Sequence, residues 1–154
     1  MKLKNIEETR KVGEFLGTIV KPYDCIALIG DLGSGKTTFT QAMAKGMGID
    51  EVVSSATFTL INIYEGEIPL YHFDAYRLET PEAFYEIGGE EYIDAPGVSV
   101  IEWADLVMDA LPEDLLILEW SRDSQEERSL TIEGTGSRSK ELEKELKEFE
   151  NHRL

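Results

Sequence analysis

The stretch CIALIGDLGSGKT, residues 25–37, decides the fold. It opens with five consecutive apolar residues, a run that is typical of a strand buried on both faces of a parallel sheet. A glycine-rich turn follows. From about Lys36, apolar residues then recur at every fourth position (Phe39, Met43 and Met47), which predicts a helix. The order of strand, glycine-rich turn and helix indicates an α/β domain.

The turn itself, GDLGSGKT at 30–37, matches the phosphate-loop pattern G-x-x-x-x-G-K-[ST] in full. Its glycines allow successive backbone N–H groups to point into one concavity, where phosphate oxygens bind. Lys36 would bring a positive charge to the β- and γ-phosphates, at the positive end of the helix that begins there. The hydroxyl of Thr37 is the expected ligand to Mg²⁺. The pattern therefore predicts a nucleoside triphosphate site.

A phosphate loop also needs a second Mg²⁺ ligand, a carboxylate at the end of a neighbouring buried strand. Two acids qualify, because Asp74 closes the β-rich run LYHFD and Glu102 closes VSVIE. On the residues alone the two are equivalent. Whichever does not hold the metal would orient the attacking water. His72, inside LYHFD, is interpreted as a packed strand residue.

Strands and helices alternate along the rest of the chain, which predicts an α/β, P-loop NTPase-like three-layer sandwich with a mainly parallel central sheet and antiparallel edge strands. We expect a P-loop ATPase domain over 1–136 and a helical tail, 137–154, packed on it or extending from it. The other expected elements are a helix capped by Asn5 and ended by Pro22, a hairpin of 57–64 and 68–74 with a three-residue turn, a helix from Pro81 after the cap Thr80, a strand at 98–101, an amphipathic helix at 103–110, and strands at 115–120 and 130–132.

Charge is distributed unevenly over the 154 residues, whose formal net charge is −16. Residues 51–136 hold 20 acidic and 3 basic groups, whereas residues 1–50 are nearly neutral. Such a surface repels nucleic-acid phosphate and anionic membranes, so a protein partner or a metal fits better. The single cysteine excludes a disulfide within the chain, and no apolar stretch has the length of a signal peptide or membrane span. We expect a cytoplasmic protein.

Four motifs occur in a characteristic order: GDLGSGKTT at 30–38, S-x-TFTL at 55–60, HFDAYRL at 72–78 and IEWAD at 101–105. With them the chain resembles the TsaE (YjeE) family, the small P-loop ATPases of bacterial tRNA threonylcarbamoyladenosine synthesis. One departure is Ala56, which stands where the family usually has proline. The change frees the backbone at the start of a segment that the family uses as a switch.

The resemblance implies roles for particular residues. It assigns Mg²⁺ to Thr37 and Glu102, and it gives Asp74 an essential role in hydrolysis, so that the catalytic residues are Asp74, Glu102 and Lys36. It implies that ATP is held by Thr9, Gly30, Gly33, Ser34, Gly35, Lys36, Thr37, Thr38 and Arg128. It also implies that the protein binds the TsaD and TsaB transferase heterodimer, which modifies adenosine 37 of ANN-decoding tRNAs, and that it meets tRNA only indirectly.

Two other classes of function are also compatible with a phosphate loop. A P-loop kinase for small molecules usually needs several arginines on its lid and acceptor site, and residues 46–137 hold only Arg77, Arg122 and Arg128. A binding module gated by the nucleotide, which never hydrolyses it, would share the same loop. A GTPase is disfavoured because the chain has no N-K-x-D motif.

Overall fold

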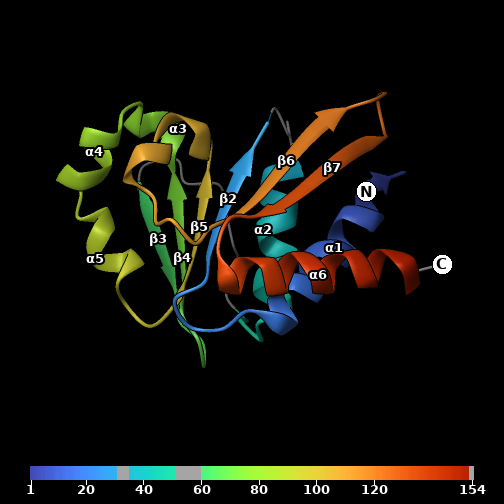
Figure 1. Cartoon of the computed structure of the whole chain (residues 1–154), viewed down its shortest axis with the longest axis horizontal. Helices are drawn as coiled ribbons and strands as arrows, with labels where there is room; N and C mark the ends of the chain where they lie inside the picture. The colour runs from blue at the N-terminus through green and yellow to red at the C-terminus, as the bar shows by residue number, and fades with distance from the viewer. Residues whose placement is uncertain (31–34, 51–59, 153–154) are drawn as a thin grey trace.

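A seven-stranded mixed sheet forms the centre of the computed structural model, which describes residues 1–30, 35–50 and 60–152 (Figure 1). Its strands are β1 (Lys2–Leu3), β2 (Cys25–Ile29), β3 (Ile61–Tyr64), β4 (Leu70–Asp74), β5 (Val98–Glu102), β6 (Leu116–Arg122) and β7 (Arg128–Gly134). They lie in the order β1-β7-β6-β2-β5-β4-β3. The central strands β6, β2, β5 and β4 run parallel, while β1, β7 and β3 pair antiparallel towards the two edges. The predicted sheet is thus confirmed.

Helices cover both faces of the sheet, so the molecule has the three layers expected of an α/β sandwich (Figure 1). One face carries α1 (Ile6–Ile19), α2 (Gly35–Gly46) and α6 (Ser137–His152). The other carries α3 (Ala75–Leu78), α4 (Pro81–Glu86), α5 (Gly89–Ile93) and the 3₁₀ turns η1 (Ala104–Leu106) and η2 (Met108–Ala110). Successive β2 residues enter opposite cores, since Ile26 and Leu28 pack under the long helices and Ala27 packs under the short ones.

The predicted helix starts are confirmed at two caps. The side chain of Asn5 accepts a hydrogen bond from the Glu8 N–H at 3.1 Å and begins α1. The Thr80 hydroxyl accepts from the Ala83 N–H at 3.2 Å, directly before Pro81. Each cap satisfies an N–H group that has no carbonyl partner inside its own helix.

Helices α1 and α2 touch backbone to backbone through glycines. A Cβ atom added at Gly17 would lie 2.1 Å from the Met43 carbonyl oxygen and 2.9 Å from the Gly46 Cα. A Cβ at Gly13, one turn earlier, would meet the Phe39 carbonyl oxygen at 2.9 Å. The two helices therefore lie closer together at Gly17 than any side chain would allow. This contact sets where α2 sits on the sheet.

Gly17→Ala is expected to lower the free energy of unfolding by about 2 kcal/mol, because the added methyl group must push α2 away from α1. Alanine is the better helix former by about 1 kcal/mol, so a purely local effect would have the opposite sign. Urea denaturation followed by circular dichroism measures the change. Gly13→Ala serves as the graded comparison and should cost less. Equal or greater stability of Gly17→Ala would contradict the close contact.

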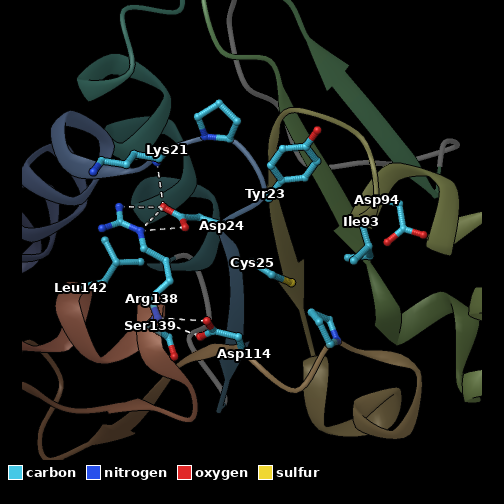
Figure 2. Close-up of a pocket in the computed structure, with 12 residues that line it drawn as sticks. Lys21, Tyr23, Asp24, Cys25, Ile93, Asp94, Asp114, Arg138, Ser139 and Leu142 are labelled. Atoms are coloured by element: carbon cyan, nitrogen blue, oxygen red, sulfur yellow. Dashed lines mark hydrogen bonds and ion pairs between the residues drawn. The ribbon is translucent and has the colours of Figure 1, made fainter.

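The first turn of α6 is fixed to the body of the protein by two carboxylates (Figure 2). Arg138 donates to the Asp24 carboxylate from Nε and Nη2, both at 3.0 Å, and from Nη2 to the Ile19 carbonyl at 2.9 Å. Asp114 accepts from the backbone N–H groups of Arg138 and Ser139. Partial burial raises the pKa of the Asp114 carboxyl, but the hydrogen bonds from Ser139 and Arg138 outweigh it and hold that pKa below its usual range. Helix α6 is thus anchored at its N-terminus.

The amphipathic helix predicted at 103–110 is wrong, because the chain forms the two 3₁₀ turns η1 and η2 instead. Trp103 has left-handed backbone angles, φ 58° and ψ 39°, and Val107 leaves the helical region at φ −129°. A right-handed helix cannot continue through such residues. The apolar residues of the predicted face still pack inward, since Val107 is fully buried and Trp103, Leu106 and Ala110 pack, partly buried, against the same core.

The hairpin between β3 and β4 has a longer connection than predicted. Tyr64 pairs with Leu70, so five residues rather than three join the strands. Pro69 has no N–H to donate to a sheet, which delays the start of β4. The beginning of the first predicted strand, 57–59, lies outside the described residues. Strand β1 and the short helices α3 and α5 were not predicted.

Candidate nucleotide and metal site

The two candidate carboxylates lie side by side at the carboxyl edge of the parallel strands. Asp74 ends β4, Glu102 ends β5, and the two are register partners. Glu102 is also aligned with Leu28 of β2, one residue before the strand ends. Because aligned residues of neighbouring strands point to the same face, both acids lie on the face that α2 covers. The ends of β2, β4 and β5 and the start of α2 lie at one edge of the molecule (Figure 1). Both acids lie at this edge, because they are the last residues of β4 and β5.

Gly30, the first residue of the phosphate-loop pattern, lies where only glycine fits. Its φ of 109° is in the region that side chains avoid, and an added Cβ would lie 2.3 Å from the Trp120 carbonyl oxygen. The close approach to β6 turns the chain sharply after β2. Helix α2 begins five residues later at Gly35, so its N-terminus lies at this edge.

The remaining loop positions are described only in part. Gly33, Ser34 and the motif S-x-TFTL up to residue 59, including Ala56, lie outside the described residues, and so do the side chains at positions 35 and 36. Thr37 and Thr38 are half-buried in the first turn of α2. Thr38 lines a cavity of about 220 Å³ between α1 and α2, together with Arg10 and Lys45.

Asp74 has a structural task besides its candidate chemical one. Its Oδ1 accepts a hydrogen bond from the Tyr76 N–H at 3.1 Å, and the residue is the N-cap of α3. Oδ2 lies 3.8 Å from Nε of Arg77. The side chain keeps 19% of its surface exposed. A carboxylate held in this way is oriented and accessible, as an acid that directs a water molecule must be.

Glu102 is more deeply buried and touches a histidine. Its side chain is 12% exposed, and its Oε1 lies 3.4 Å from Nε2 of His72, whose side chain is 1% exposed. The alignment is not that of a hydrogen bond, and Oε1 finds no such partner among the described residues. His72 is packed in the strand, as predicted, but the sequence analysis missed its contact with Glu102. Alternation in LYHFD could have revealed it, because His72 and Asp74 share a face.

Thr9 and Arg128 lie towards the same side of the molecule. Leu3 of β1 pairs with Arg128 at the start of β7, and α1, which contains Thr9, begins shortly after β1. Thr9 is 4% exposed. The Arg128 guanidinium donates to the carbonyl oxygens of Ser124 and Glu127 in the turn between β6 and β7, at 3.1 and 3.0 Å. In this structure its contacts therefore stabilise that turn.

The arrangement fits a phosphate-bound Mg²⁺ better than a metal site made of protein alone. Within the described part of the chain, no three His, Cys, Asp or Glu side chains gather as a metal site. Mg²⁺ usually binds one or two protein ligands and takes the rest from phosphates and water. The carboxylate of Glu102, whose side chain is 12% exposed at the end of β5, offers an oxygen of the required kind at the required edge.

A separate cavity of about 430 Å³ lies at the opposite edge, where the parallel strands begin (Figure 2). Lys21, Asp24, Asp94 and Arg138 line it, whereas none of the predicted site residues does. Five residues of β2, about 16 Å of strand, separate it from the phosphate loop. Cys25 borders this cavity but is 4% exposed. Burial, with a smaller contribution from Asp24, raises the pKa of its thiol well above the usual range.

The sheet order, the Gly30 turn and the two strand-end acids define the class of protein, an α/β sandwich of the P-loop NTPase-like type. The crystal structure of Bacillus subtilis YdiB superposes with a TM-score of 0.84 at 38% identity, covering 98% of this chain and 95% of that one. The family model described as threonylcarbamoyl adenosine biosynthesis protein TsaE matches residues 3–130. The chain belongs to the TsaE family.

Curated relatives carry the same family description. The tRNA threonylcarbamoyladenosine biosynthesis protein TsaE of Bacillus subtilis (strain 168) is 40% identical over 148 residues, which cover 96% of this chain and 92% of the relative. The protein of that name from Treponema pallidum (strain Nichols) is 40% identical over 71% of this chain and 82% of its own. These matches confirm the resemblance drawn from the four motifs.

Proposed function

We propose that the protein is a Mg²⁺-dependent ATPase that supports threonylcarbamoylation of adenosine 37 in ANN-decoding tRNAs. Membership of the TsaE family supports the place in tRNA threonylcarbamoyladenosine synthesis. The observation that carries the ATPase assignment is the register pairing of Asp74 with Glu102, beside the strand that leads into the phosphate loop. Acids on adjacent strands at this edge are what a hydrolytic P-loop site requires.

Each residue has a distinct task in this proposal. Loop amides, Lys36 and the N-terminus of α2 bind the phosphates of ATP. Thr37 and Glu102 hold Mg²⁺, which, when bound, neutralises the charge that develops on the phosphate oxygens. Asp74 accepts a hydrogen bond from the attacking water and aligns it with the terminal phosphate. Thr9 and Arg128 flank the nucleotide.

The partner in this proposal is the TsaD and TsaB transferase heterodimer, with tRNA reached only through the complex. The charge distribution supports docking to protein, because α4 and α5 expose four glutamates, Glu82, Glu86, Glu90 and Glu91. Tyr85 on the same surface is 45% exposed. In the described residues, none of the helices combines the length and apolar character needed to cross a membrane.

The experiment that tests the proposal is incubation of the purified protein with ATP and Mg²⁺, with and without the transferase heterodimer. We expect slow release of inorganic phosphate from the protein alone, and repeated rounds of tRNA modification only when ATP, Mg²⁺ and all proteins are present. Phosphate transfer to a metabolite instead of water would identify a small-molecule kinase. Modification sustained equally by a non-hydrolysable analogue would identify a nucleotide-gated binding module.

Glu102→Gln is expected to raise the Mg²⁺ concentration needed for half-maximal hydrolysis by roughly tenfold or more, because an amide oxygen is a weaker ligand than a carboxylate. Affinity for ATP in EDTA should not change. The measurement is a Mg²⁺ titration of phosphate release at saturating ATP, with Glu119→Gln as control, because Glu119 is exposed and lies in the middle of β6. An unaltered Mg²⁺ dependence would mean that Asp74 is the metal ligand and that the two roles are exchanged.

A further inference from the structure

Three polar side chains form a row across β3, β4 and β5, directly behind the candidate metal edge. Asn62 of β3 is the register partner of His72 in β4. His72 in turn places Nε2 3.4 Å from Oε1 of Glu102 in β5. Directly opposed residues of antiparallel strands have Cβ atoms about 5 Å apart, so the Asn62 amide can reach the imidazole ring. We call these three residues the polar row.

The polar row contains four buried atoms that form no hydrogen bond with any described residue. They are Nδ2 of Asn62, Nδ1 and Nε2 of His72, and Oε1 of Glu102. Buried polar atoms are almost always paired, because an unpaired one has lost its hydrogen bonds to water without replacement. Four such atoms on neighbouring residues of three adjacent strands, with Asn62 paired to His72 and His72 beside Glu102, indicate a hydrogen-bond chain that small rotations would complete.

Donor and acceptor chemistry selects one arrangement of protons along the polar row. The amide Nδ2 of Asn62 can only donate and the Glu102 carboxylate can only accept. His72 must therefore accept at Nδ1 and donate from Nε2, which is the neutral ring with its proton on Nε2. The opposite tautomer would set donor against donor at Asn62 and acceptor against acceptor at Glu102.

We propose that His72, held in this tautomer by Asn62, is a positioning residue that orients Glu102 for the metal. A hydrogen bond to Oε1 fixes the plane of the carboxylate and leaves its second oxygen for the cation. Partners of this kind behind a metal ligand typically change metal affinity 10- to 100-fold. The inference rests on the proposed role of Glu102 as a Mg²⁺ ligand.

The tautomer can be measured without nucleotide or metal. Long-range ¹H–¹⁵N NMR spectra of the imidazole rings report which nitrogen carries the proton. The chain has two histidines, so His152→Gln assigns the signals. We expect the Nε2–H tautomer for His72, and a mixture of tautomers after Asn62→Leu. A proton on Nδ1 of His72 in the unaltered protein would refute the proposed hydrogen-bond chain from Asn62 through His72 to Glu102.

Metal affinity provides the second readout. Mn²⁺ titrated into the ADP complex and followed by electron paramagnetic resonance should bind 10- to 100-fold more weakly to His72→Leu. His72→Gln should retain most of the affinity, because its amide Nε2–H replaces the ring donor. Nucleotide affinity in EDTA should be the same in all three proteins. Equal losses in His72→Leu and His72→Gln would show that the ring acts by packing, and would overturn the positioning role.

Glu102→Gln in the same titration tests the proposed metal ligand separately from the positioning role of His72. Unchanged Mn²⁺ affinity in Glu102→Gln would refute the proposed metal ligand. Weakened binding in Glu102→Gln together with normal binding in His72→Leu would refute the positioning role of His72 and leave the proposed function intact.

Discussion

Lys36→Ala is expected to abolish support of tRNA modification and to weaken ATP binding about 10- to 100-fold. In the proposed site the variant would remove a charged hydrogen-bond donor to the phosphates, and such bonds contribute about 1.5 to 3 kcal/mol each. The position supports a large effect, because Lys36 is the second residue of α2, which begins at the carboxyl edge just after the Gly30 turn. At that place the helix terminus and the lysine charge would act on the same anion.

The measurement for Lys36→Ala is ATP affinity by calorimetry, followed by a modification assay reconstituted with the transferase heterodimer. Lys45→Ala is the matched control, since Lys45 lies on the same helix and is 75% exposed, with only a 3.9 Å ion pair to Glu14. Surface pairs of this type contribute little, so the control should behave like the unaltered protein. Full modification activity in Lys36→Ala would refute the phosphate-binding role.

Asp74→Asn is expected to lower the rate of ATP hydrolysis about 100-fold or more and to leave ATP affinity within about twofold. Loss of a positioned acid–base group typically costs a factor of about 10² to 10⁴. Asparagine has the same shape and is an equally good N-cap, so the hydrogen bond that begins α3 should survive. The substitution would therefore remove the proposed water-orienting carboxylate without removing the cap.

Single-turnover hydrolysis and equilibrium binding distinguish turnover from affinity in Asp74→Asn. Asp94→Asn is the control, because Asp94 is exposed and borders the cavity at the opposite edge of the sheet. It changes the net charge by the same amount and should have no effect. A variant with weakened ATP binding and a normal rate of hydrolysis would contradict the assignment of Asp74 to the water.

The central part of the fold could be predicted because its signals are local and mutually consistent. The run at 25–29 coincides with β2, and the four-residue spacing of Phe39 and Met43 identifies α2. The caps Asn5 and Thr80 were predicted because a cap depends on residues within one turn. The pairing of Asp74 with Glu102 follows from two strands that end together in a parallel sheet.

The errors lie where distant contacts or unusual backbone angles decide the structure. Strand β1 has two residues and exists because it pairs with β7, more than 120 positions away. The left-handed angles of Trp103 divide an apolar pattern that would otherwise predict a helix. Alternation in LYHFD places His72 on the same face as Asp74, but the contact of His72 with Glu102 also depends on how β4 and β5 are aligned.

The contrast between Asp74 and Glu102 shows the limit of sequence reasoning at the candidate site. Both acids end a buried strand, and nothing in the residues alone separates them. The structure distinguishes them by environment, since Asp74 caps a helix and remains accessible while Glu102 is buried against His72. Their roles remain predictions, and the two variants are designed to separate them.

The single cysteine gives the protein a built-in reporter of its own stability. Cys25 begins β2, the strand that connects the two edges of the molecule, and its thiol is both buried and hard to ionise. A thiol reagent reacts with the thiolate, so it must wait until the central strand opens. The rate of alkylation therefore measures the opening of the strand that carries the phosphate loop, without any added label, and ligands that stabilise the folded state should slow it.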